Sequence, residues 1–183
     1  MTANNDNLPL CMIRRNLANL PEVVLPPDYV IRPIQLDEGA TWVEIVRDSE
    51  RFFTVPDDLW DKQFGFDPAE AVKRVYLVMD PHDTPVATIG AWYASEKWAA
   101  EKGAGWGRIH WVATRPTAQG KGIGRAMTAF ALRRLAELGH EQAYLETSTG
   151  RRAALRLYDA FGFEPHPLTD PEALRQFQSQ VKD

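Results

Sequence analysis

The sequence predicts an α+β (mixed α/β) fold, and two patterns indicate it. Two apolar, partly β-branched runs, Val75–Met79 and Val86–Tyr93, flank a segment rich in Asp and Pro that favours a turn. They predict an antiparallel hairpin. From residue 108 onward, strand-like runs alternate with helical periodicity. An early hairpin followed by strand–helix units is typical of a mixed sheet and not of a wholly parallel one.

The first part of the chain predicts an arm, then a strand and a helix. Residues 1–27 end in a cluster of prolines, so we expect an N-terminal extended arm followed by a single domain over residues 28–183. Tyr29–Ile34 predicts a strand. Asp37 is suited to cap a helix whose apolar residues continue to Val46. Phe52–Asp67 mixes aromatic and acidic side chains without a regular period.

The second half of the chain alternates between strand and helix patterns. Ala94–Gly107 is polar and contains glycine, which predicts a loop. The elements expected after it are a strand at 108–114, a helix from Gly124 that stops before Gly139, a strand at 143–147, a helix at 151–161 stopped by Gly162, and a closing strand that begins at Phe163.

The composition indicates a single cytoplasmic domain. With 183 residues, 44% of them hydrophobic, the chain is long enough for one sizeable core. The 21 basic and 25 acidic residues give no field that would gather nucleic acid or an anionic membrane, so neither partner is expected. Cys11 is the only cysteine, which excludes an intramolecular disulfide. We expect no signal peptide and no membrane-spanning run.

A glycine-rich loop lies between the strand at 108–114 and the helix after it. Its residues are Gln119, Gly120, Lys121, Gly122, Ile123, Gly124 and Arg125. Glycines at alternate positions let an anion approach backbone N–H groups at the positive end of the helix dipole. The loop therefore suits a pyrophosphate, with a simple tight turn as the alternative. A Walker loop does not fit because Gly122 follows Lys121, and a dinucleotide fingerprint does not fit because it requires glycine at Arg125.

Two motifs in fixed order resemble those of the GNAT acetyltransferase superfamily. The first motif has a Gln or Arg, two residues, a Gly, one residue and a Gly or Ala; here the positions are filled by Gln119, Gly122 and Gly124. The second motif is filled by Ala154, the pair Leu157-Tyr158 and the pair Gly162-Phe163. One position departs from the pattern: Arg151 stands where many members have asparagine, although an Arg can contact a phosphate instead.

The resemblance implies a GNAT-like fold with a central, mostly antiparallel, twisted sheet flanked by helices on both faces. It also implies an N-acetyltransferase that uses acetyl-CoA as co-substrate, without a metal, and transfers the acetyl group to a primary amine by direct attack. Backbone N–H groups near Val112–Thr114 would stabilise the tetrahedral oxyanion. The cofactor-binding residues implied are Val112, Ala113, Thr114, Gln119, Gly120, Lys121, Gly122, Ile123, Gly124, Arg125, Arg151 and Ala154.

Two residues are expected to move protons. An alkylammonium has a pKa of about 10.4 and must lose a proton before it attacks. His110 is the leading candidate for the base, and we expect it to share a strand face with Val112 and Thr114. The serotonin N-acetyltransferase branch of the superfamily has a similar histidine. The alternative is a histidine buried in the core without a catalytic role. Glu146 is the reserve base, with an ordinary solvated or salt-bridged carboxylate as its alternative. The resemblance gives Tyr158 the general-acid role towards the CoA sulfur, with a core tyrosine as the alternative.

The acceptor and the assembly are less specified. Selectivity for a small-molecule or peptide amine is expected from Trp42–Phe66, Trp92–Trp106 and the segment beyond His166. Aromatic and acidic side chains within residues 52–64 predict either a pocket for a cationic amine or an amphipathic helix with its aromatics in the core. A non-catalytic acyl-CoA-binding or sensory module is the competing function. The resemblance leaves a homodimer open, and no heptad seam specifies one.

Overall fold

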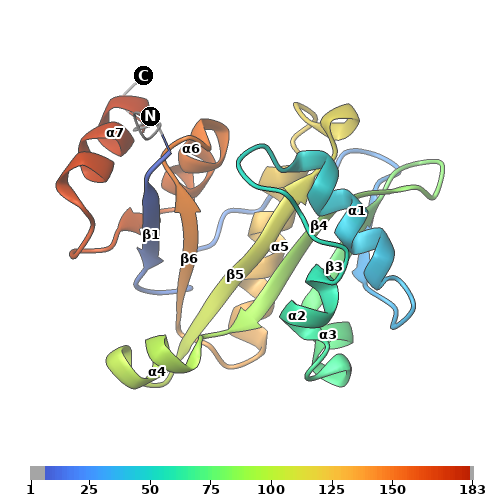
Figure 1. Ribbon diagram of the computed structural model, residues 1–183, viewed down its shortest axis with the longest axis horizontal. Coiled ribbons are helices and arrows are strands. Elements are labelled where there is room, and N and C mark those ends of the chain that lie inside the picture. The colour runs from blue at the N-terminus through green and yellow to red at the C-terminus, as the bar shows by residue number, and fades with distance from the viewer. Residues whose placement is uncertain (1–6, 182–183) are drawn as a thin grey trace. The chain divides into compact units, whose positions relative to one another are not determined.

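The computed structural model describes residues 7–181, which form an α+β structure as predicted (Figure 1). In chain order the elements are β1 (Pro9–Arg14), β2 (Val30–Pro33), α1 (Gly39–Ser49), α2 (Leu59–Phe64), α3 (Pro68–Arg74), β3 (Val75–Met79), β4 (Pro85–Tyr93), α4 (Glu96–Lys102), β5 (Trp106–Thr114), the 3₁₀ turn η1 (Pro116–Ala118), α5 (Ile123–Glu137), β6 (Gln142–Ser148), α6 (Arg152–Ala160), β7 (Glu164–Pro165) and α7 (Pro171–Val181).

The chain divides into two compact units, each built from separate stretches of sequence. The terminal unit comprises the described residues up to Pro21, Tyr93–Arg108, and those from Leu135 onward. The central unit comprises Glu22–Trp92 and Ile109–Arg134. Residues 28–183, which were expected to form a single domain, thus divide between these two units.

The central unit contains the predicted hairpin. Strands β3 and β4 pair antiparallel, with a register shift between Val78 and Met79, and β2 pairs antiparallel with β3. Every residue of β3 is buried, as an apolar run with both faces covered requires. The hairpin prediction is confirmed.

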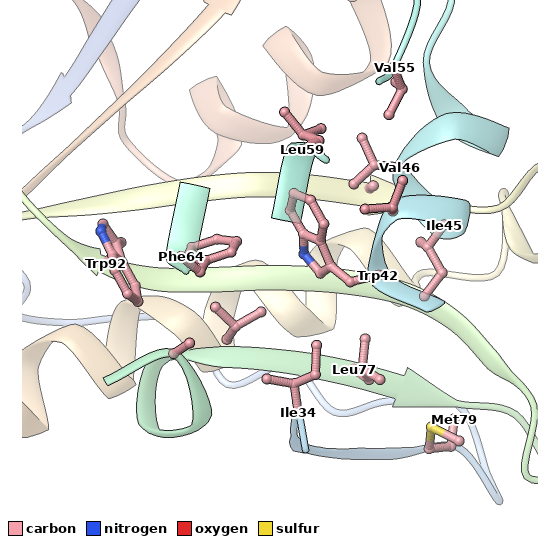
Figure 2. Packing of buried hydrophobic residues seen from close by; sticks show 14 residues of the cluster. Ile34, Trp42, Ile45, Val46, Val55, Leu59, Phe64, Leu77, Met79 and Trp92 are labelled. Atoms are coloured by element: carbon pink, nitrogen blue, oxygen red, sulfur yellow. The ribbon is translucent and has the colours of Figure 1, made fainter. Parts of the chain in front are cut away.

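An aromatic core fills the central unit. Trp42 of α1 is fully buried, and its ring centroid lies 5.3 Å from that of Phe64 of α2 and 5.5 Å from that of Trp60. Figure 2 shows Phe64 between Trp42 and Trp92, and the Phe64 and Trp92 centroids are 4.9 Å apart. Because these edge-to-face contacts add to the burial of large apolar areas, they fix α1 and α2 relative to β4.

The segment 59–64 therefore follows the amphipathic-helix interpretation. Phe64 is fully buried, while Asp61 and Lys62 are exposed. Phe52 and Phe53 lie before α2 and are 43% and 45% exposed, so only part of the aromatic set enters the core.

The terminal unit shows that part of the predicted arm is a strand. Strand β1 pairs antiparallel with β6 over six residues and with β7 at Met12 and Ile13, so it has a partner on each side. Its side chains Leu10, Met12 and Ile13 are buried. The prediction of an arm over residues 1–27 was wrong for 9–14, because hydrogen bonds to two neighbouring strands and burial of three apolar side chains stabilise an extended segment. Residues 1–6 lie outside the described residues.

Strand β6 pairs with β1 and also with the start of β5. The first residues of β5 pair in parallel with β6, from Trp106 opposite Gln142 to Arg108 opposite Tyr144. The described pairs are thus antiparallel except for β5 with β6, as a mostly antiparallel mixed sheet requires.

The short helices α3 and α4, which lie in polar segments, were not predicted from the sequence. The predicted loop at 94–107 contains α4, whose N-cap Ser95 accepts a hydrogen bond from the Trp98 amide at 3.2 Å. Asp67 caps α3 in the same way through the Glu70 amide at 3.1 Å. Asp37 does not cap α1: the N-cap is Glu38, and its carboxylate binds Arg32 and the Gln35 amide instead. No helix among the described residues is long and apolar enough to cross a membrane.

Candidate active site

The glycine loop lies in the central unit, between η1 and α5. Gly120 and Gly122 have φ values of 76° and 81°, in the left-handed region that favours glycine. A Cβ atom added at either glycine would meet no other atom within 4 Å. These glycines are therefore required by the backbone conformation and not by crowding, and the space beside them is open to a ligand.

The start of α5 supplies anion-binding groups to this loop. The first backbone hydrogen bond of the helix is donated by Ala126 to the Gly122 carbonyl at 3.1 Å. The amides of the preceding helical positions, which include Ile123 and Gly124, therefore have no partner within the helix. Because the helix dipole is positive at this end, the first turn of α5 attracts negative charge.

Side chains of the loop are held on neighbouring segments. The Gln119 amide donates a hydrogen bond from Nε2 to the Thr114 carbonyl at 2.9 Å, which fixes the loop to the end of β5. The Lys121 ammonium lies 3.3 Å from the Tyr29 hydroxyl and 5.9 Å from the centre of its ring. Both Gln119 and Lys121 are exposed. The loop thus carries the positive charge of Lys121 at the surface, between two glycines whose surroundings are open.

His110 lies in β5 and is buried, with 7% of its surface exposed. Its Nε2 atom is 3.2 Å from Oε1 of Gln63, a residue of α2. The imidazole centroid lies 5.8 Å from the Phe64 ring and 5.9 Å from the Trp111 ring. His110 therefore combines a polar partner with an aromatic surrounding.

Trp111 changes which side chains share a face of β5. Its φ is 48°, a left-handed conformation that is unusual for a large side chain and that interrupts the alternation of a strand. Trp111 and His110 both contact Gln63, and Ala113 belongs to the same buried cluster as Trp42. The expectation that His110 shares a face with Val112 and Thr114 was therefore wrong.

Tyr158 belongs to the terminal unit, on α6. It is buried, and its ring centroid lies 5.9 Å from that of Phe163. Burial raises the pKa of its phenol from 10.0 to about 12, against a smaller lowering by the nearby positive charge of Arg151. The phenol is protonated at neutral pH with or without this shift.

The other predicted residues divide between the units. His110, Val112, Ala113, Thr114 and the loop 119–125 lie in the central unit, while Arg151, Ala154, Tyr158 and Glu146 lie in the terminal unit. Arg151 occupies the N-cap position of α6 without a side-chain cap, and Ala154 is half-buried on that helix.

Glu146 forms an ion pair with Arg108, which agrees with its alternative interpretation as a salt-bridged carboxylate. It also lines a pocket of about 230 Å³ in the terminal unit. The pocket is bounded by β1, β6 and the turn before α7; its lining residues are Pro9, Leu10, Cys11, Glu146, Thr147, His166, Leu168, Thr169 and Asp170. The described residues contain no group of three or more His, Cys, Asp or Glu side chains that could hold a metal ion.

Two residues near the predicted site were missed from the sequence. Gln63 contacts His110 from 47 residues away in the chain, and Tyr29 contacts Lys121 from 92 residues away. Neither residue belongs to a motif, because both contacts depend on tertiary packing. Only the aromatic pattern around residue 63 indicated a buried helix there.

Comparison with known proteins agrees with the geometry of the loop. The chain matches the model of the Acetyltransferase (GNAT) family over residues 40–163. It is 30% identical over 176 residues to a mycothiol acetyltransferase of Kocuria rhizophila, an alignment that covers 90% of this chain and 55% of that protein. The chain therefore spans about half the length of the curated relatives it matches.

Solved structures share the fold at lower identity. A GCN5-related N-acetyltransferase from Sphaerobacter thermophilus superposes with a TM-score of 0.70 at 21% identity, covering 87% of this chain and 49% of that one. Glucosamine-6-phosphate N-acetyltransferase from Arabidopsis thaliana gives a TM-score of 0.54 at 16% identity, covering 78% and 95%. With a family match over most of its length, a glycine loop at the start of α5 and the second motif on α6, this chain belongs to the GNAT acetyltransferase family.

Proposed function

We propose that the chain catalyses transfer of an acetyl group from acetyl-CoA to the primary amine of a small-molecule or peptide acceptor. The observation that carries the proposal is the glycine loop, whose left-handed glycines and open flank adjoin the positive end of α5. Family membership and the acetyltransferase names of the relatives support it. The amine nitrogen attacks the thioester carbon, the C–S bond breaks, one proton leaves the amine, and one proton reaches the thiolate.

The proposed roles follow the chemistry of each group. The loop 119–125 binds the pyrophosphate through backbone N–H groups and Lys121. His110 accepts the proton of the amine, and Tyr158 donates a proton to the thiolate. Backbone N–H groups of Val112–Thr114 stabilise the oxyanion.

The acceptor site is proposed to include the pocket in the terminal unit. Three of its lining residues, Leu168, Thr169 and Asp170, belong to the segment expected to provide selectivity. Asp170 supplies a carboxylate that attracts a cationic amine, Glu146 supplies one that is paired with Arg108, and Thr147 supplies a hydroxyl. This charge pattern favours a small polar amine over an apolar one.

A thermal melt with and without acetyl-CoA tests the loop. At about 100 times the dissociation constant, binding to the native state should raise Tm by roughly 5–10 °C. Gly122→Glu should abolish that rise, because a carboxylate would occupy the open space and repel phosphate.

Gly139→Glu is the matched control for this variant. Gly139 has a φ of 86° and equally open surroundings, but it lies beyond the end of α5. Gly139→Glu should lose about as much stability as Gly122→Glu, but its Tm should still rise fully with acetyl-CoA. If wild type shows no rise in Tm at millimolar acetyl-CoA, the loop assignment is wrong.

Tyr158→Phe separates the enzyme from the sensory module. The variant keeps the ring packed against Phe163 and removes only the hydroxyl, so kcat should fall by about 100-fold while the Tm response to acetyl-CoA remains. Tyr76→Phe, which removes the hydroxyl of another buried tyrosine outside the predicted site, is the control and should keep wild-type kcat. An unchanged kcat in Tyr158→Phe contradicts the general-acid role.

A further inference from the structure

Gln63 is the polar centre of the aromatic cluster in the central unit. It lies on α2 and is half-buried. Its Oε1 atom is 3.0 Å from Nε1 of Trp111 and 3.2 Å from Nε2 of His110. Two neighbouring residues of β5 therefore share one acceptor atom on a helix.

The Trp111 contact fixes the orientation of the Gln63 amide. An indole Nε1–H can only donate a hydrogen bond, so the atom that faces it must be the amide oxygen and not the NH₂ group. The same oxygen then faces the imidazole. Because an amide oxygen can only accept, the Nε2 atom of His110 must carry a proton to bond with it.

This protonation leaves only one basic nitrogen on neutral His110. In the neutral imidazole one nitrogen carries hydrogen and the other accepts a proton. With hydrogen on Nε2, the accepting nitrogen is Nδ1. The contact with Gln63, whose amide is oriented by Trp111, thus favours the Nε2–H tautomer.

The backbone of Trp111 makes this arrangement possible. In a regular strand, consecutive side chains point to opposite faces, and only one of His110 and Trp111 could then reach Gln63. The φ of 48° at Trp111 turns both side chains towards α2. The energetic cost of that conformation is offset by a two-donor contact that a regular strand would lack.

We propose that Gln63 is a positioning residue that holds neutral His110 as the Nε2–H tautomer, so that Nδ1 takes the proton of the acceptor amine. The second half of this statement rests on the proposed function, in which His110 is the base. The first half concerns the resting protein alone, and the experiments below separate the two.

The imidazole nitrogen signals of ¹⁵N-labelled protein test the tautomer without any substrate. The chain has four histidines, and the signals of His110 are identified by their loss in His110→Asn. We expect a protonated nitrogen at Nε2 and an unprotonated one at Nδ1 above the titration midpoint. Hydrogen on Nδ1 instead would overturn the inference, whatever the enzyme does.

Two variants at position 63 test the role of the amide. Gln63→Glu retains an acceptor for both donors, so it should keep the Nε2–H tautomer and raise the midpoint of the His110 titration by roughly one pH unit. Gln63→Leu removes the acceptor and should give a mixture of tautomers. Gln178→Glu, which adds the same charge at an exposed position of α7, should leave the His110 signals unchanged.

Steady-state kinetics connect the tautomer to turnover. In Gln63→Leu we expect kcat to fall by about tenfold with little change in the KM for acetyl-CoA, and in Gln63→Glu the acidic limb of the pH–rate profile should move upward with the His110 titration. If the nitrogen signals behave as expected but His110→Gln keeps wild-type kcat, the base assignment in the proposed function fails while the tautomer assignment stands. If Gln63→Leu keeps a pure Nε2–H tautomer, Gln63 is not the positioning residue.

Discussion

Gly122 and Trp111 lie in the same unit and both have a left-handed backbone, but for different reasons. At Gly122 the φ of 81° has little steric cost, because glycine lacks a Cβ atom and its surroundings are open. At Trp111 the φ of 48° is imposed on a bulky residue whose ring lies 5.5 Å from that of Trp42 and 6.3 Å from that of Phe53. The conformation of the glycine loop is thus encoded by its own residues, whereas the surroundings of His110 are encoded by tertiary packing.

Replacing Trp111 should have the largest effect on stability. Trp111→Ala removes the contacts with Trp42, Phe53 and Gln63, and we expect a loss of about 3 kcal/mol in the free energy of unfolding. Urea denaturation measures it. Trp111→Gly removes one more methyl group, but it should be about 1 kcal/mol more stable than Trp111→Ala because glycine tolerates positive φ.

Which of these two variants is more stable shows whether the positive φ at Trp111 is strained. If Trp111→Gly is the less stable of the two, the positive φ at this position is not a source of strain. Phe66→Ala serves as control, since that aromatic is 74% exposed and its removal should cost less than about 0.5 kcal/mol.

A smaller effect is expected at the loop glycine. Gly122→Ala forces a Cβ atom into the left-handed region without any clash, so it should cost about 1 kcal/mol. Gly139→Ala has a similar φ and similar open space, and should cost the same amount within the error of chemical denaturation. A cost at Gly122 several times that at Gly139 would show that the loop is held by contacts and not by its own conformational freedom.

The smallest expected effect is a loss of stability at alkaline pH, caused by ionisation of the buried Tyr158. Burial raises the pKa of its phenol from 10.0 to about 12, so the folded state holds the proton more tightly than the unfolded chain. This contribution to stability is complete below pH 10 and is lost as the pH rises through about 12. Cys11, whose thiol pKa burial raises from 9.0 to about 12, acts with the same sign above pH 9.

Urea denaturation at a series of pH values measures this loss. The free energy of unfolding should fall between pH 9 and pH 11, and it should fall less steeply in Tyr158→Phe and in Cys11→Ser. A slope that neither variant changes would mean that these groups are not protected from solvent.

The accuracy of the sequence predictions follows from how local each signal is. The hairpin, α5 and α6 were predicted because their apolar periodicity and terminal glycines lie within the elements themselves. Strand β1 was missed because its short apolar run becomes a strand only between β6 and β7. The loop 119–125 was located from glycine spacing, but neither the face of His110 nor its contact with Gln63 could be found, since both depend on the backbone of Trp111.

Strand β1 also sets a limit on how this chain folds during synthesis. Its six residues are translated roughly 130 residues before their main partner β6. At bacterial or eukaryotic elongation rates, the delay is on the order of ten seconds. Throughout that interval the nascent chain presents the apolar side chains of Leu10, Met12 and Ile13 without their strand neighbours, so the terminal unit closes last and depends on what shields its first strand.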